Sequence, residues 1–214
     1  MDEVASINRW IRILGFFYGI SLFVSVLLNY TTRFRSFGWQ VFTQVSLGLL
    51  AAGFIAVLWS DLKKLFSGNG FSLAKAAVYS GAAVLASLLV NLAVHWANRL
   101  FFHHHIVIYE RFLNLQYPTL GMITLLVILP AFFEEIAYRG VVLGSLLPLA
   151  EPRRAILLSA VLFAIVHMSF ISFFWLVPFS VWLGNVRYRE GTIWYGVLIH
   201  LFFNLTACLS EFIL

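Results

Sequence analysis

Long apolar runs separated by short polar links make up most of the chain. The runs cover about residues 10–28, 41–59, 74–96, 120–149, 155–170, 171–186 and 192–214. A helix needs about 20 apolar residues to cross the hydrocarbon core of a bilayer. The pattern therefore predicts an all-α fold, a polytopic membrane helix bundle with about seven transmembrane helices and a range of about six to eight.

One link is longer than the others and runs from Asn98 to Pro118. Its apolar centre, residues 106–109, is too short to span a bilayer, so we expect it to lie at the membrane interface. No long polar stretch divides the apolar runs. We therefore expect one continuous membrane domain, with amino-terminal helices and the interfacial link in residues 1–115 and a second helical part in residues 116–214.

Composition supports a membrane protein and argues against nucleic-acid binding. The chain is 62% hydrophobic and only 11% charged, whereas soluble domains are about 45–50% apolar and about 25% charged. The net charge of +5 comes from Lys and Arg residues at the ends of apolar runs. There they indicate topology and contact lipid headgroups. The face with more of these residues includes the amino-terminal tail, so we expect a cytoplasmic amino terminus.

Three charged residues lie inside the run 120–149. Each charge at the centre of a membrane helix costs about 2.5–3.5 kcal/mol, so such residues are kept when they pair or react. Glu135 and Arg139 are four residues apart and can pair on one helix face. Glu134 shares the neighbouring face with Tyr138. The spacing thus predicts a structural pair and one carboxylate, Glu134, that is left for chemistry.

A proline interrupts the same run one turn before the carboxylates. Pro130 has no N–H, so it cannot donate the helical hydrogen bond to the carbonyl of Leu126. The loss of such a bond commonly bends a helix. We therefore expect a kink beside Glu134.

Two later runs carry polar side chains at a similar depth. His200 and Asn204 share one helix face, and Phe163 lies one turn before His167. At about 1.5 Å per residue from the expected cytoplasmic helix ends, Glu134, His167 and His200 lie roughly 21, 20 and 14 Å into the membrane. A lone buried histidine is more often a packing residue. The shared depth on three helices favours one functional site.

These residue types suit hydrolysis by either of two arrangements. In the first, Glu134 and His167 hold and deprotonate a water molecule. His200 and Asn204 then donate hydrogen bonds to the oxyanion that forms at a peptide carbonyl. In the second, Glu134, His167 and His200 bind Zn²⁺, which activates the water. The residue types leave both arrangements open.

Three other features receive simpler interpretations. The run His103-His104-His105 looks like a metal motif, but it lies in a link without a Cys or carboxylate at ligand spacing. We interpret it as a solvated loop, with adventitious metal binding as the second interpretation. Cys208 is the single cysteine and cannot form an internal disulfide, so we expect a small buried hydrophobe. Met168 is expected to serve in packing.

Over about its last hundred residues the chain resembles the CAAX protease and bacteriocin-processing family of intramembrane endopeptidases, also called the CPBP or Abi family. Three motifs carry the resemblance, in order and in separate apolar runs. They are Glu134-Glu135 with Arg139, Phe163 with His167, and His200 with Asn204. The aromatic Tyr138 before Arg139, Gly140 after it, and the stretch 191–194 also match the family's pattern.

The resemblance implies a CPBP/Abi-like catalytic core in residues 116–214 that cleaves peptide bonds near the membrane. In that role Glu134 is the general base, His167 positions the water, and His200 with Asn204 forms the oxyanion site. Supporting positions are Glu135, Arg139, Phe163 and Tyr138. The family has been described both as metalloproteases and as metal-independent glutamate proteases, so either Zn²⁺ or no cofactor is implied.

The same resemblance implies a peptide or membrane-protein substrate and the lipid bilayer as partners. Some members process prenylated proteins of the CAAX type. This chain is smaller than the eukaryotic members of that group, which favours a multi-pass protein of a bacterial cytoplasmic membrane that processes or degrades peptides. Two other functions stand beside it: a non-catalytic immunity or regulatory protein that keeps the family fold, and a proton-coupled carrier.

Overall fold

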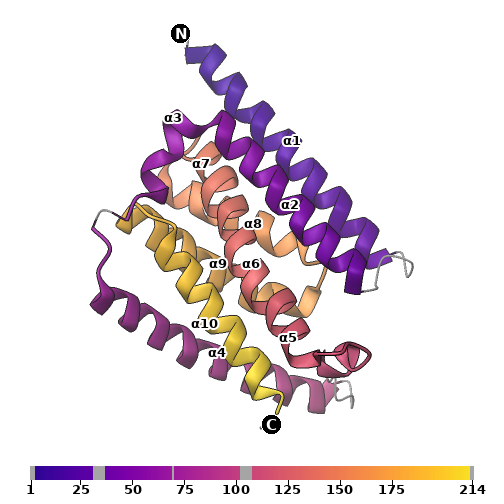
Figure 1. Cartoon of the computed structure of the whole chain (residues 1–214). Coiled ribbons are helices and arrows are strands. Elements are labelled where there is room, and N and C mark those ends of the chain that lie inside the picture. The colour runs from indigo at the N-terminus through magenta and orange to yellow at the C-terminus, as the bar shows by residue number, and fades with distance from the viewer. Residues whose placement is uncertain (1–2, 31–36, 69, 102–107, 213–214) are drawn as a thin grey trace. The chain divides into compact units, whose positions relative to one another are not determined.

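The computed structural model describes residues 3–30, 37–68, 70–101 and 108–212, and their regular structure is helical throughout (Figure 1). The helices are α1 (Glu3–Tyr30), α2 (Phe37–Val57), α3 (Trp59–Leu62), α4 (Leu73–Phe101), α5 (Pro118–Ile123), α6 (Leu129–Glu134), α7 (Leu143–Leu146), α8 (Pro152–Val166), α9 (Phe170–Glu190) and α10 (Trp194–Ser210). The prediction of an all-α helical membrane fold is confirmed.

Short helical turns of other types join these helices. Lys63–Phe66 and Ile108–Phe112 are 3₁₀ turns, and Thr124–Ile128 and Glu135–Val142 are π-helical. Ile108 and Tyr109 of the predicted interfacial segment thus begin a 3₁₀ turn, while residues 106–107 and His103-His104-His105 lie outside the described residues.

Among the described residues, five helical segments are long and apolar enough to cross a membrane, by length and composition. They are Ile7–Leu27, Phe37–Val57, Leu73–Leu100, Pro118–Leu146 and Phe170–Glu190. Each coincides with one of the predicted runs. The two remaining runs form α8, with 15 residues, and α10, with 17. At about 1.5 Å per residue, α8 is roughly 22 Å long, which is less than the hydrocarbon core of about 30 Å.

The boundaries of the fifth and sixth runs differ from the prediction. The fifth run forms α8, which ends at Val166 rather than near Phe170. The sixth run forms α9, which extends from Phe170 to Glu190 with Pro178 inside it. A proline removes only one helical hydrogen bond, and neighbouring helices in a membrane protein can compensate for that loss.

The chain divides into two compact units, each made of two segments. The first unit contains Met1–Gly68 and Phe133–Gly196, and the second contains Asn69–Phe132 and Val197–Leu214. The predicted division after residue 115 stays a prediction. The carboxylates and His167 belong to the first unit, whereas His200 and Asn204 belong to the second.

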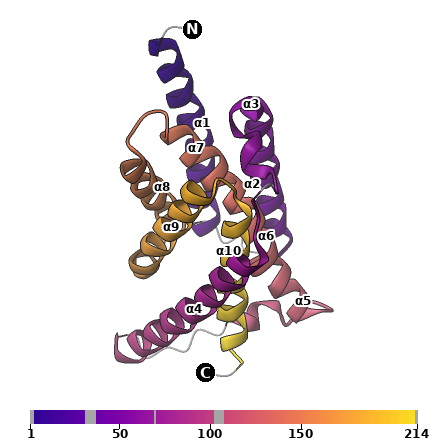
Figure 2. The same ribbon diagram turned by 90° about the vertical axis from the view of Figure 1, so that its left-hand side faces the viewer.

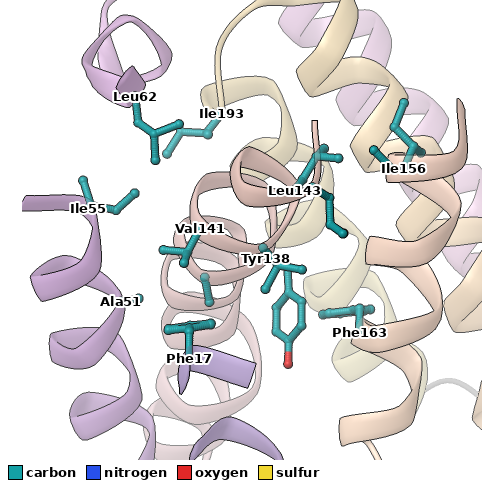
Figure 3. Packing of buried hydrophobic residues seen from close by; sticks show 14 of the residues in the cluster. Phe17, Ala51, Ile55, Leu62, Tyr138, Val141, Leu143, Ile156, Phe163 and Ile193 are labelled. Carbon is teal, nitrogen blue, oxygen red and sulfur yellow. The ribbon is translucent and has the colours of Figure 1, made fainter. Parts of the chain in front are cut away.

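Close helix packing builds the core of the first unit. The helices α1 and α2 lie side by side (Figure 1), and α2 packs against the π-helical segment. A Cβ added at Gly48 would come within 2.5 Å of the ring of Phe133. Small residues that let helices approach this closely are typical of membrane interiors. Figure 3 shows some of the buried side chains of this core, among them Phe17, Tyr138 and Phe163.

The hairpin of α8 and α9 completes the first unit. Its two helices lie side by side in Figures 1 and 2. A Cβ at Gly184 would lie 3.0 Å from Ile156, so the glycine allows this contact. Beyond α9, the hydroxyl of Thr192 donates to the carbonyl of Leu65 at 3.0 Å, and the indole of Trp194 donates to the carbonyl of Phe66 at 3.2 Å. These bonds hold the start of α10 against the 3₁₀ turn Lys63–Phe66.

One buried hydrogen bond joins α4 to α10 in the second unit, and further bonds lie beside it. The hydroxyl of Ser87 donates to the carbonyl of Phe203 at 2.7 Å, and the amide of Asn91 donates to the Ser87 oxygen at 3.2 Å. The backbone N–H of Tyr109 donates to the carboxylate of Glu211 at 3.1 Å. These contacts position the part of α10 that carries the third motif.

Candidate active site

The first motif lies on a widened part of its helix. Glu135 begins the π-helical segment, and Arg139 lies within it. Such segments occur frequently at functional sites, because the extra residue in a turn changes the direction of nearby side chains. The Arg139 Nη1 atom lies 3.2 Å from Glu135 Oε1, and both side chains are essentially fully buried. The ion pair predicted from the four-residue spacing is therefore present.

A third polar residue, Ser180 on α9, completes the environment of this ion pair. Arg139 Nη2 donates a hydrogen bond to Ser180 Oγ at 3.0 Å and lies 3.4 Å from the Ser180 carbonyl oxygen. Buried charges are tolerated when they are paired and hydrogen-bonded. Sequence analysis did not identify Ser180, because nothing in its local sequence shows that it faces an arginine on another helix.

Aromatic contacts connect the first motif to the second. The Arg139 guanidinium carbon lies 4.8 Å from the centre of the Phe163 ring, a cation–π distance. The ring of Tyr138 meets Phe163 edge-on at 4.9 Å, as Figure 3 shows, and the ring of His167 lies 4.6 Å from Phe163. Phe163 thus packs between the arginine of the first motif and the histidine of the second.

His167 lies at the end of its helix, not in the middle. Its Nδ1 atom is 2.8 Å from the carbonyl oxygen of Phe163. Because a carbonyl only accepts hydrogen bonds, Nδ1 carries the proton and donates it. This fixes the ring and leaves Nε2 without a proton when the imidazole is neutral.

The next residue explains why α8 stops at this point. Met168 has a φ of 50°, in the left-handed region that residues other than glycine rarely adopt. Its N–H donates to the carbonyl of Ile165 at 3.0 Å, which closes the last turn. The structure thus gives Met168 a role in ending the helix, in addition to the packing that sequence analysis expected.

The carboxylate of Glu134 faces the imidazole of His167. The distance from Glu134 Oε2 to His167 Nε2 is 3.9 Å. Their side chains are 20% and 32% exposed, respectively, in contrast to the fully buried Glu135 and Arg139. The structure therefore separates the two adjacent glutamates, one inside a buried ion pair and one beside a partly accessible histidine.

A glycine at the start of α10 lies directly against the buried carboxylate. A Cβ added at Gly196 would lie 2.6 Å from Glu135 Oε2. No side chain larger than hydrogen fits there without a shift of the carboxylate. Sequence analysis did not single out Gly196, although a glycine in an apolar helix is a sign of close packing.

The second unit holds the third motif. His200 is 3% exposed. Asn204 is partly buried, and its Nδ2 atom donates to the carbonyl oxygen of Leu126 at 2.9 Å. This is the carbonyl to which Pro130 cannot donate. The approach of His200 and Asn204 to Glu134 and His167 stays a prediction.

Glu134 and His167 are a pair of potential metal ligands. Catalytic zinc sites commonly take three protein ligands. Among the residues that the structure describes, no group of three or more His, Cys, Asp or Glu side chains is placed to hold a metal ion. Glu134 and His167 by themselves supply two of the three protein ligands that such a site takes.

The three motifs lie within a segment that matches a family of known function. Residues 115–206 match the family model described as type II CAAX prenyl endopeptidase Rce1-like. This segment is therefore similar to that family. The resemblance predicted from the motifs is thereby confirmed for residues 115–206. No curated protein and no solved structure matches the chain.

The Rce1-like segment supports a protease that is embedded in a membrane. It includes α5–α9 and α10 as far as residue 206, and therefore all three motifs. The helices α1, α2 and α4 lie outside the match. Together with the five apolar helices found among the described residues, the match supports a multi-pass membrane protein.

Proposed function

We propose that this protein is an intramembrane endopeptidase in which Glu134 and His167 activate water, and His200 and Asn204 stabilise the oxyanion. The observation that supports it most strongly is the contact between Glu134 Oε2 and His167 Nε2, at 3.9 Å. The family match supports the reaction class.

The two facing atoms are both hydrogen-bond acceptors when the carboxylate is ionised and the imidazole is neutral. Two acceptors cannot bond to each other, and 3.9 Å is too long for a direct hydrogen bond. One water molecule can satisfy both by donating one hydrogen to Glu134 and the other to His167. Its oxygen lone pairs then point away from both groups, toward a substrate carbonyl.

The reaction then proceeds by acid–base catalysis. The water oxygen bonds to the carbonyl carbon of the scissile peptide, and Glu134 takes the water proton. The carbonyl oxygen becomes an oxyanion. When the intermediate collapses, the carbon–nitrogen bond breaks, and protonated Glu134 gives its proton to the leaving amine. The products are one peptide with a new carboxylate and one with a new amine.

His200 and Asn204 are proposed as hydrogen-bond donors to the oxyanion. The amide of Asn204 has two N–H groups. One N–H accounts for the bond to Leu126, which orients the side chain, and the second is available for the substrate. Donors that are fixed before reaction stabilise charge that develops in the transition state.

The substrate is a peptide or membrane protein cleaved near the bilayer. The family description names prenyl endopeptidases, so CAAX-type processing is the first substrate class to test. We propose glutamate-type catalysis, without a metal, and location in a bacterial cytoplasmic membrane with the amino terminus in the cytoplasm.

The test uses purified protein in lipid vesicles and two fluorogenic peptides that end in a CAAX sequence, one farnesylated and one not. Glu134→Gln should lower cleavage by at least about 10²-fold, the scale of general-base catalysis, with an unchanged Tm. The matched control is Glu151→Gln, because the Glu151 side chain is 77% exposed and forms a surface pair with Arg154.

Two results would overturn this assignment. If Glu134→Gln cleaves as well as the parent protein, the general base is another residue. The second result has two parts. The parent protein cleaves neither of the two peptides and no general membrane-protein substrate, and its effect in cells survives the combined loss of Glu134, His167 and His200. Together these would show that the protein is a non-catalytic partner.

A further inference from the structure

A buried serine on α4 contacts the backbone of the third motif. Ser87 is fully buried, on a helix whose other side chains are mostly exposed or half-buried. Its hydroxyl donates to the carbonyl oxygen of Phe203 at 2.7 Å, and both residues belong to the second unit. Phe203 lies directly before Asn204 in the sequence. The serine therefore bonds the peptide group that joins Phe203 to a residue proposed for oxyanion binding.

A second residue of α4 directs the hydroxyl of Ser87. The Asn91 amide donates to Ser87 Oγ at 3.2 Å and to the Ser87 carbonyl oxygen at 2.9 Å. A hydroxyl group can accept hydrogen bonds and still donate its own proton elsewhere. Asn91 and Ser87 thus form a chain of two hydrogen bonds that ends on the backbone of α10.

Several other hydroxyl groups on the membrane helices bond within their own helix. Those of Ser21, Thr43 and Thr206 each donate to the carbonyl oxygen four residues earlier, at 2.7 to 2.9 Å. This local bond is common for a serine or threonine inside a helix. Ser87 has the same option at the Ala83 carbonyl but donates to α10 instead. Its hydrogen bond therefore joins two helices.

Asn204 is held at both its side chain and its backbone within the second unit. The side-chain amide donates to the carbonyl oxygen of Leu126 at 2.9 Å. The peptide group before Asn204 accepts the bond from Ser87 through the Phe203 carbonyl. The first bond orients the amide, and the second fixes the backbone that carries it. Both are in place without a substrate.

We propose that Ser87 and Asn91 are positioning residues for the peptidase reaction, because they fix the peptide group that carries the oxyanion donor Asn204. This role depends on the proposed function. Donors stabilise a developing charge best when their direction is set before the reaction. A displacement of about 1 Å can lower the rate about 10²-fold. Since α4 lies outside the matched segment 115–206, both residues are additions to the three motifs.

The test compares kcat and KM of purified variants in lipid vesicles, with a peptide that the parent protein cleaves. Ser87→Ala should keep the fold, because the Phe203 carbonyl retains its helical bond from the N–H of Ala207. It should lower kcat about tenfold with KM unchanged, since the oxyanion exists only after the substrate is bound. Ser80→Ala is the matched control, because it removes a half-buried hydroxyl from the same helix. It should change neither constant.

Two further variants separate positioning from a general loss of stability. In an Asn204→Ala background, Ser87→Ala should cause almost no further loss of kcat, because the donor that it positions is absent. A serine needed only for stability would lower activity in both backgrounds. Asn91→Ala leaves the hydroxyl of Ser87 in place and should lower kcat about threefold. It tests the same chain of bonds if Ser87→Ala does not fold.

Amide hydrogen exchange provides a readout that needs no activity. Ser87→Ala should speed exchange in the part of α10 around Asn204 about three- to tenfold, and Ser80→Ala should not. If the parent cleaves no peptide while Ser87→Ala shows this faster exchange, the proposed function and the catalytic part of this inference both fail, and the anchoring of α10 stands. With an active parent, the inference is overturned if Ser87→Ala keeps its kcat, raises KM alone, or loses as much kcat without Asn204 as with it.

Discussion

The side chain of Asn204 supplies a hydrogen bond that the backbone at Pro130 cannot make. The Asn204 amide donates to the Leu126 carbonyl at 2.9 Å, the acceptor that an N–H at position 130 would use in an α-helix. The π-helical turn Thr124–Ile128 lies just before the proline. A residue predicted for catalysis thus also compensates for a proline on another helix.

This relationship predicts a strong coupling between the two positions. Asn204→Ala should lower the free energy of unfolding by about 1–3 kcal/mol, because it removes a partner of a partly buried carbonyl. Pro130→Ala restores a backbone N–H, so the same Asn204→Ala change should cost less in that background. Thermal and chemical unfolding of the four proteins in a double-mutant cycle measures the difference. Additive effects would contradict the explanation.

Gly196 should be intolerant of even one methyl group. A Cβ there would lie 2.6 Å from Glu135 Oε2, so Gly196→Ala must displace a buried carboxylate or the start of α10. We expect a loss of about 1–3 kcal/mol in stability, typical of overpacking, measured by Tm. Gly81→Ala on α4 is the control, because a Cβ there meets nothing within 4 Å. It should be neutral or stabilising.

Much of the fold could be predicted from the sequence, since apolar runs long enough to span a bilayer have few alternatives to a helix. The pairing of Glu135 with Arg139 could also be predicted, because helical spacing fixes which side chains meet. Ser180 and Gly196 could not, because their importance depends on which helix packs against the first motif. Helix order alone does not reveal that.

The end of α8 shows a second limit of sequence reasoning. The run 155–170 is mostly apolar and contains neither glycine nor proline, so its pattern predicts a helix through His167. The structure ends that helix with a left-handed Met168 instead. Local preferences do not favour this conformation, and tertiary packing must hold it in place.

The buried ion pair should be easier to remove whole than to break. Glu135→Leu leaves Arg139 buried without its carboxylate and should cost about 3–5 kcal/mol. Glu135→Leu with Arg139→Met removes both charges and should recover much of that loss. Chemical unfolding in detergent compares the two variants with the parent. If the double variant is less stable than the single one, other bonds, such as that to Ser180, matter more than the charge balance.

Metal removal separates the two chemical arrangements that the residue types allow. Glutamate-type catalysis predicts that cleavage survives extended dialysis against a strong zinc chelator, because Glu134 and His167 act on water directly. Rates before and after dialysis, and after Zn²⁺ is returned, provide the measurement. Activity that is lost on chelation and restored by Zn²⁺ alone would instead favour Glu134, His167 and His200 as metal ligands.

Met168 should control the geometry of His167 through the backbone. A φ of 50° is unfavourable for a residue with a Cβ atom, so Met168→Gly relieves backbone strain. The same change gives the unfolded chain more conformational freedom and removes side-chain contacts, and both of these effects lower stability. Met168→Val places a β-branched residue in a conformation that such residues tolerate least. Its free energy of unfolding should be about 1–3 kcal/mol lower than that of the parent protein.

Met168→Val should also impair catalysis. The turn after α8 holds His167 Nδ1 against the Phe163 carbonyl. Under the proposed mechanism, Met168→Val should therefore lower kcat more than it raises KM, because it would displace the proposed bridging water while substrate binding is kept. Met168→Leu is the control, because it keeps a similar volume without branching at Cβ. Equal kcat values for Met168→Val and Met168→Leu would show that the backbone at this position does not set the histidine's alignment.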